Sequence, residues 1–187
     1  MEINGEYQID ARRETVWRAL NDPEMLKNCI PGCDSIEKIS DTEFDAKVTA
    51  AIGPVRAKFN TSLSLEDLNP PVSYRLVGES KAAAGFGRGS ATVELDEKDG
   101  GTLLRYNAEF NVGGKLAQVG SRLVLGATKK TADQFFGAFS NALDPGAERV
   151  DAATVAELPS RKAGLPWPLI LAAAAAAVLL IGWILLR

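Results

Sequence analysis

The residue types that usually carry enzyme chemistry are scarce in this chain. Its 187 residues include no histidine, so the commonest general base and the commonest metal ligand are both absent. Cys29 and Cys33 are spaced C-x-x-x-C, whereas a metal site needs four ligands and a redox pair usually has the spacing C-x-x-C. We interpret both as structural cysteines at the mouth of a pocket, and we expect no catalytic residues and no metal site.

Two glycine-rich stretches and one acidic cluster are weak candidates for chemistry. The stretches 85–89 and 113–115 lack the Lys-Ser/Thr or Ser/Thr of a phosphate-binding loop. Asp96, Glu97 and Asp99 lie in a predicted hairpin turn, where carboxylates are usually solvated. The remaining inward-facing candidates are neutral hydrogen-bonding residues, which suit the orientation of a polar head inside an apolar hole: Tyr7, Tyr74, Tyr106, Thr131 and Gln134.

The stretch 113–143 has the length and period of one long amphipathic helix. The middle of its apolar stripe is small, with Gly120, Ala127, Thr131 and Ala138, while bulkier residues flank it. A helix packed closely against a sheet usually fills that stripe with large side chains. The pattern therefore indicates either a hollow between helix and sheet or large sheet residues that fill the gap from the other side.

The chain before this helix predicts a curved antiparallel sheet. Alternating residues give a first strand that ends near Ile9, two short helices follow over 13–20 and 24–28, and six meandering strands follow these. Each strand has one apolar face, so one helix must cover one side of the sheet. We predict an α+β helix-grip fold of about seven strands over residues 1–143.

Period alone also gives the residues that line the expected hollow. The helix contributes Leu123, Val124, Ala127, Thr131 and Phe135. The strands contribute Phe59, Leu63, Tyr74, Tyr106 and Phe110, and Phe86 is placed on the rim. The expected opening lies near the Cys29–Cys33 turn or near the turn 52–54.

The last 44 residues predict a different organisation. Residues 144–164 are rich in Pro, Gly, Ala and charge and are expected to form a flexible linker. Residues 165–186 carry no charge, so 165–187 is a predicted transmembrane anchor rather than an Ala-rich core helix. Arg161 and Lys162 precede it, and no secretory signal is evident, which predicts a cytoplasmic domain on the inner membrane. The net charge of −3 argues against a nucleic-acid partner.

Five stretches, in this order, resemble the carbon monoxide dehydrogenase CoxG family, which belongs to the START/Bet v 1-like helix-grip superfamily. They are RETVWRALNDPEMLKNCIPGC, IGPVRAKF, LNPPVSYRLVGES, AGFGRGSATVEL and GGKLAQVGSRLVLGATKKTADQFFGAF. The stretches CIPGC and GGKLAQVGSR are the most specific. The resemblance covers about residues 1–143.

This resemblance implies an accessory role without a cofactor of its own. The family is associated with recruiting the molybdenum carbon monoxide dehydrogenase to the membrane and with binding a respiratory quinone for it. The expected partners are that dehydrogenase, membrane lipid and a bound isoprenoid quinone. Two alternatives stay open, a docking adaptor with a closed cavity and a cyclase- or hydrolase-like enzyme. The sequence does not distinguish ubiquinone from menaquinone.

Overall fold

The computed structural model describes residues 1–144, which form one sheet and four helices. The strands are β1 (Glu2–Ile9), β2 (Cys33–Lys38), β3 (Glu43–Ile52), β4 (Val55–Asn69), β5 (Ser73–Ala82), β6 (Gly85–Lys98) and β7 (Gly101–Gly114). The helices are α1 (Arg13–Leu20), α2 (Pro23–Cys29), α3 (Lys115–Gln118) and α4 (Ser121–Leu143).

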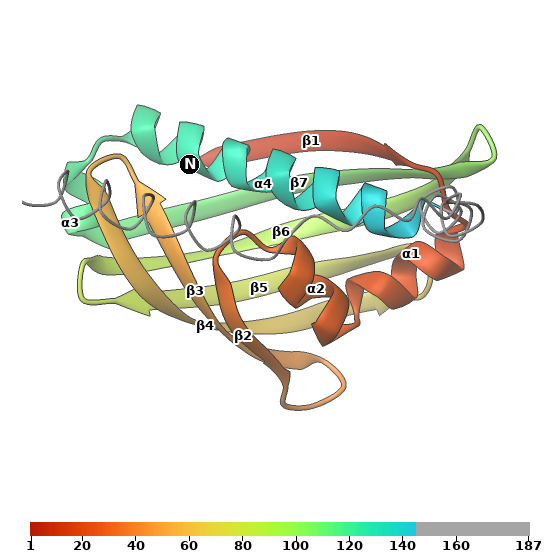
Figure 1. Ribbon diagram of the computed structural model, residues 1–187, viewed down its shortest axis with the longest axis horizontal. Helices are drawn as coiled ribbons and strands as arrows, with labels where there is room; N and C mark the ends of the chain where they lie inside the picture. Colours follow the sequence, from red (N-terminus) through yellow and green to blue (C-terminus); the bar gives the residue numbers. More distant parts are fainter. Residues whose placement is uncertain (145–187) are drawn as a thin grey trace, which may run out of the picture. The chain divides into compact units, whose positions relative to one another are not determined.

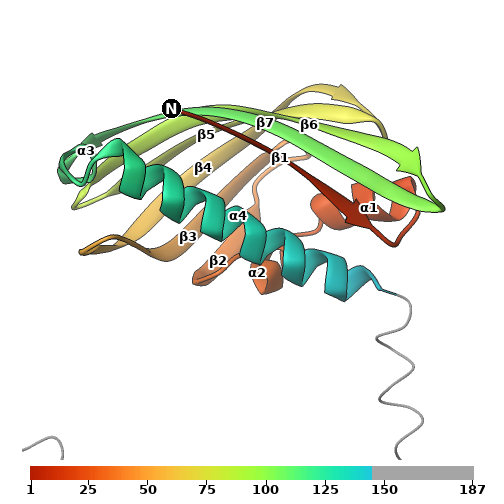
Figure 2. The ribbon, with the colours of Figure 1, turned by 90° about the horizontal axis from the view of Figure 1, so that it is seen from above.

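All seven strands lie in one antiparallel sheet of order β1-β7-β6-β5-β4-β3-β2. Strands β2 to β7 are therefore a simple meander, and β1 closes the far edge against β7. The sheet curves, and α4 crosses its concave side, while α1 and α2 pack near the end of the sheet at which α4 finishes (Figures 1 and 2). The predicted helix-grip fold, with two short helices after the first strand, is confirmed.

The main hydrophobic core lies where α1, α2 and the second half of α4 meet the sheet. Ile9, Leu95 and Leu104 from three neighbouring strands are fully buried there, and so are Val16 of α1 and Phe139 of α4. Fully burying side chains of this size stabilises the fold by about 1.5–3 kcal/mol each. The first half of α4 has no comparable core beneath it, since Val124 is the one residue in that half that is buried.

The prediction of a single helix over 113–143 is wrong. Gly113 and Gly114 are the last residues of β7, and the helical stretch breaks at Val119–Gly120 into α3 and α4. Gly120 has a φ of 94°, a left-handed conformation that ends α3 and that only glycine adopts without strain. Leu116 and Val124 are both buried, so the hydrophobic period continues across the break and conceals it in the sequence.

The predicted linker from residue 145 onward and the predicted membrane anchor lie outside the described residues. Within residues 1–144, no helix has the length and hydrophobicity that a membrane crossing requires.

Candidate functional site

A groove of about 850 Å³ runs between α4, the turn after α2 and the second half of β3. Its volume is in the range of small-molecule sites, about 300–1,000 Å³. We call it the α4 groove. Its lining residues are Ile30, Pro31, Gly32, Val48, Thr49, Ala50, Ala51, Ile52, Gly53, Arg122, Leu123, Gly126, Ala127, Thr128, Lys130, Thr131, Ala132, Gln134, Phe135 and Phe136.

Two glycine turns shape the walls of the α4 groove. Gly32 has a φ of 72°, and a Cβ there would lie 2.2 Å from the carbonyl oxygen of Thr49, so only glycine lets the turn after α2 approach β3 this closely. The amide of Thr49 donates to the carbonyl of Gly32 over 2.8 Å. At the β3–β4 turn, a Cβ on Gly53 would lie 3.2 Å from Val119 and 3.5 Å from Leu123, so this hairpin meets the start of α4.

Small residues on α4 leave the groove open. Gly126 and Ala127 line it, and a Cβ built on Gly126 would have no atom within 4 Å. Leu123 is 53% exposed although it is large and apolar. Sheet residues do not fill the space beneath this part of the helix, and the hollow predicted from the small stripe is present at the first half of α4.

The polar groups of the groove are mainly hydrogen-bond donors. No carboxylate is among its described lining residues. The hydroxyls of Thr128 and Thr131 donate to helix carbonyls of Val124 and Ala127. Within residues 1–144, the side chains of Arg122, Lys130 and Gln134 have no hydrogen bond or ion pair, so their N–H groups are available to an acceptor on a bound molecule.

Four of the eleven predicted ligand-binding residues lie on the wall of the α4 groove: Leu123, Ala127, Thr131 and Phe135. Val124 follows Leu123 but is 2% exposed and faces the interior. The groove also touches both predicted openings, since Ile30–Gly32 and Ile52–Gly53 line it.

The predicted strand residues lie elsewhere. Phe59 is buried and pairs with Val48, a wall residue, so it lies beside the groove and not on its surface. Tyr74 is buried in the main core with its ring edge-on to Trp17, at a centroid distance of 5.5 Å. Phe110 is half-buried on β7, against Gly89. The period of two gives the face of a strand correctly, but it does not tell which end of that face is covered.

Three further predictions are corrected by position. The ring of Phe86 covers Gly113, under the guanidinium of Arg88 at 5.1 Å, and not the rim of the groove. Tyr106 stacks with Tyr7 and Phe136 between β1 and α4. Leu63 lies by a second depression, described below. The wall residues that the sequence did not single out come mostly from β3, whose small residues carry no special signal.

Both cysteines are free thiols. Cys29 is 4% exposed and belongs to the main core, and Cys33 packs beside Ile36 and Phe44. Burial raises the pKa of both thiols, which disfavours the thiolate that redox chemistry and metal binding require. No group of three potential metal ligands occurs within residues 1–144.

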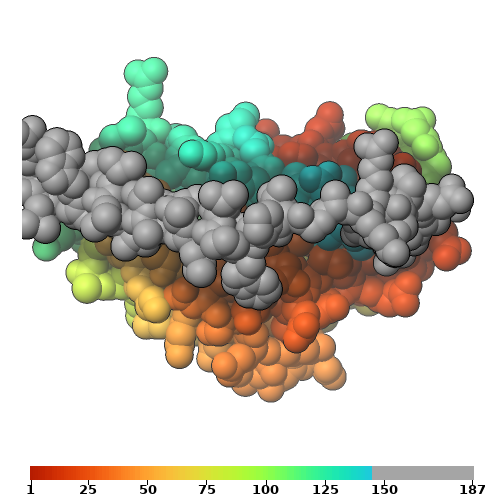
Figure 3. Space-filling model, in the orientation of Figure 1, coloured from red at the N-terminus to blue at the C-terminus, as the bar shows by residue number. Residues whose placement is uncertain are grey.

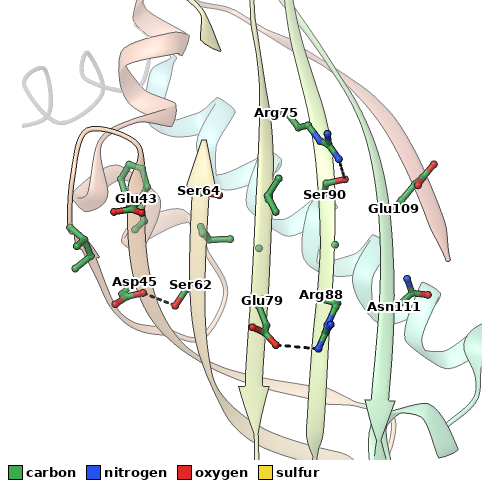
Figure 4. Close-up of a pocket in the computed structure, with 16 residues that line it drawn as sticks. Glu43, Asp45, Ser62, Ser64, Arg75, Glu79, Arg88, Ser90, Glu109 and Asn111 are labelled. Carbon is green, nitrogen blue, oxygen red and sulfur yellow. Dashed lines mark hydrogen bonds and ion pairs between the residues drawn. The ribbon is translucent and has the colours of Figure 1, made fainter. Parts of the chain in front are cut away.

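The second depression, of about 820 Å³, lies on the polar face of the sheet. Its side chains largely pair with one another (Figure 4). Arg88 and Glu79 form an ion pair at 3.5 Å, the Ser62 hydroxyl donates to Asp45 over 2.8 Å, and Arg75 donates to Ser90 over 3.3 Å. This surface is suited to water rather than to an apolar guest.

The three tyrosines should titrate late in alkali. Burial raises the pKa of Tyr7, Tyr74 and Tyr106 above the ordinary 10.0, and for Tyr7 the hydrogen bond it donates to Asp133 over 2.6 Å adds to the effect. Because the unfolded chain loses these protons first, stability is unaffected below pH 10 and falls above it. Phenolate absorbance against pH tests this expectation. Asp133→Asn should lower the pKa of Tyr7, and three tyrosines titrating near pH 10 would contradict it.

Comparison with known families gives one match over most of the domain. Residues 5–144 match the family described as carbon monoxide dehydrogenase CoxG. No curated protein is similar enough in sequence to be matched.

Solved structures show the same fold. A conserved protein from Geobacillus kaustophilus is 30% identical with a TM-score of 0.72, and the match covers 76% of this chain and 95% of that one. The Zhui aromatase/cyclase from Streptomyces sp. R1128 is 12% identical with a TM-score of 0.60, over 82% and 97% of the two chains. A START superfamily protein from Mycobacterium smegmatis is 11% identical with a TM-score of 0.59, over 76% and 97%. The described domain thus has a START-like fold, and a 30%-identical relative consists almost entirely of it.

Proposed function

Since this chain belongs to the carbon monoxide dehydrogenase CoxG family, we propose that it binds a respiratory quinone in the α4 groove and presents it to the molybdenum carbon monoxide dehydrogenase at the membrane. The observation that carries this proposal is the groove itself, an apolar opening of about 850 Å³ under the first half of α4.

The polar complement of the groove supports a quinone over other apolar guests. A quinone ring carries two carbonyl acceptors and no donor. The free groups on the groove wall are donors, on Arg122, Lys130 and Gln134, and no carboxylate lies among the described lining residues. Buried donors without acceptors would cost free energy, so a ring with acceptors at this position is favoured over a plain hydrocarbon.

The energetics of transfer set a condition on the groove. An isoprenoid tail leaves a lipid environment when the protein takes it up, so the apolar walls must replace those contacts at about 0.8 kcal/mol per CH₂. Ile30, Val48, Ile52, Leu123 and Phe135 offer such walls. A groove of this size holds the ring and the first part of the tail, which leaves the remaining isoprene units in contact with lipid.

The predicted anchor over 165–187 belongs to the same proposal. It would hold the domain on the cytoplasmic face of the inner membrane, where quinone is dissolved, and would bring a soluble dehydrogenase there. The domain has no chemistry of its own in this account, because the chain lacks histidine and the described groove lining lacks a carboxylate.

The test uses the full chain, purified in mild detergent, with its bound lipid identified by native mass spectrometry. We expect about one quinone per chain, displaced by a short-chain quinone and not by an alkane of equal length. An unrelated single-span membrane protein, purified in the same way, provides the background. Quinone at background level would contradict the proposal and would leave a docking adaptor without a ligand.

A further inference from the structure

Positive charge is concentrated in two segments of a chain whose net charge is −3. Residues 46–65 and 110–132 together contain seven lysines and arginines and not one aspartate or glutamate. In contrast, the β6–β7 hairpin carries Glu94, Asp96, Glu97 and Asp99. The domain is therefore basic in one region and acidic in another.

The two basic segments meet at the end of the sheet where α4 begins. Gly53, at the tip of the β3–β4 hairpin, contacts Val119 and Leu123. The amide of Leu116 donates to the carbonyl of Ala84 at the tip of the β5–β6 hairpin. Two hairpin tips and the start of α4 therefore form one surface, and the α4 groove opens beside it.

Most of the cations on this surface are not neutralised. Asp34 pairs with Lys58 at 2.9 Å, and Glu79 pairs with Lys81 and Arg88. Asp133, the first carboxylate on α4, accepts the Tyr7 hydroxyl. Exposed cations that have no ion pair within residues 1–144 make up what we call the basic rim: Arg56, Lys115, Arg122, Lys129 and Lys130.

An exposed apolar side chain lies within the basic rim. Leu123 is 53% exposed, between Arg122 and Lys130 on the helix surface, since residues three and four apart are neighbours on a helix. The first half of α4 projects from the molecular surface in the space-filling view (Figure 3). Cations around an apolar residue, beside the mouth of an apolar groove, match the chemistry of an anionic bilayer surface better than that of an acidic protein.

We propose that the basic rim docks the domain on anionic phospholipid headgroups with the mouth of the α4 groove toward the bilayer. Arg56, Lys115 and Lys129 contact phosphates, while Leu123 enters the headgroup layer. The use of this orientation, transfer of a quinone between bilayer and groove, rests on the proposed function. The docking itself depends only on charge and apolar exposure.

The test uses residues 1–152, a unit compact by itself and similar in extent to the relative from Geobacillus kaustophilus. Co-sedimentation is measured with quinone-free vesicles of phosphatidylglycerol and phosphatidylcholine, and with phosphatidylcholine alone. We expect binding to the anionic vesicles only, weakened by salt. Because each cation at such a surface is worth about a fivefold change in affinity, Arg56→Gln/Lys129→Gln should weaken binding about 20-fold.

The matched control is Arg12→Gln/Arg18→Gln, which removes the same charge from exposed positions on and beside α1 and should change binding less than about threefold. Neither Arg56 nor Lys129 lines the groove, so the first variant should bind a short-chain quinone in solution normally, which separates docking from the proposed function. No preference for anionic vesicles, or equal losses in the two variants, would overturn the proposal; the first result would leave an acidic protein surface as the partner of the basic rim.

Discussion

Replacing Ala127 with tryptophan should block quinone uptake and leave the domain folded. Ala127 is half-buried on the groove wall of α4, near Gly126, which has open space beside it. An indole placed there would occupy the volume that the ring and the first isoprene unit need. Displacing about four CH₂ groups costs about 3 kcal/mol, which is about a 100-fold loss of affinity.

Ala138→Trp is the matched control for this variant. Ala138 lies on the same helix, is exposed and does not line the groove, so an indole there should leave quinone affinity within about twofold. Quinone binding is measured by fluorescence quenching or calorimetry, and circular dichroism verifies the fold of both variants. Unchanged affinity of Ala127→Trp would place the ligand outside the α4 groove.

Replacing Phe139 with alanine should have the opposite profile, a large loss of stability with little effect on binding by the folded fraction. Phe139 is fully buried in the main core and its ring stacks with Phe135 at 5.7 Å. A Phe→Ala change in a core costs about 3–5 kcal/mol, because a cavity adds to the lost transfer free energy. The free energy of unfolding in urea, measured on residues 1–152, checks this value.

Leu123→Ala is the comparison for the core variant. Leu123 is on the same helix but is 53% exposed, so its truncation should change the free energy of unfolding by less than about 1 kcal/mol. Together the two variants test whether α4 is held by its second half and spans an unfilled space with its first half. Similar losses for Phe139→Ala and Leu123→Ala would contradict that division.

The sheet could be predicted because its signal is local. Side chains alternate between the two faces of a strand, and the short turns at 53–54 and 99–100 leave a meander as the natural topology. The bounds of α1 were predicted correctly for a similar reason, since Asn21 and Pro23 follow its apolar residues directly. The lengths of β5 and β6 were underestimated, because Ala82–Gly85 is a hairpin tip that reads as a loose loop in the sequence.

The site could be predicted in part. Helical period placed Ala127 and Thr131 on the groove wall, because both the small stripe and its direction belong to one element. It did not place Tyr74 and Tyr106 correctly, because their strands are apolar along their whole length and only the packing of α1, α2 and the aromatic cluster decides which end is filled. That packing joins residues far apart in the chain, and no local pattern contains it.

The most direct test of this account is the position of the ligand within the domain. Nuclear magnetic resonance of methyl-labelled protein, titrated with a short-chain quinone, reports each Ile, Leu and Val separately. We expect the methyl signals of Val48, Ile52 and Leu123 to shift together at one affinity, while those of Leu95 and Leu104 in the filled core stay in place. Shifts confined to the core, or no saturable shift at the three groove methyls, would contradict the claim that the space under α4 holds the quinone.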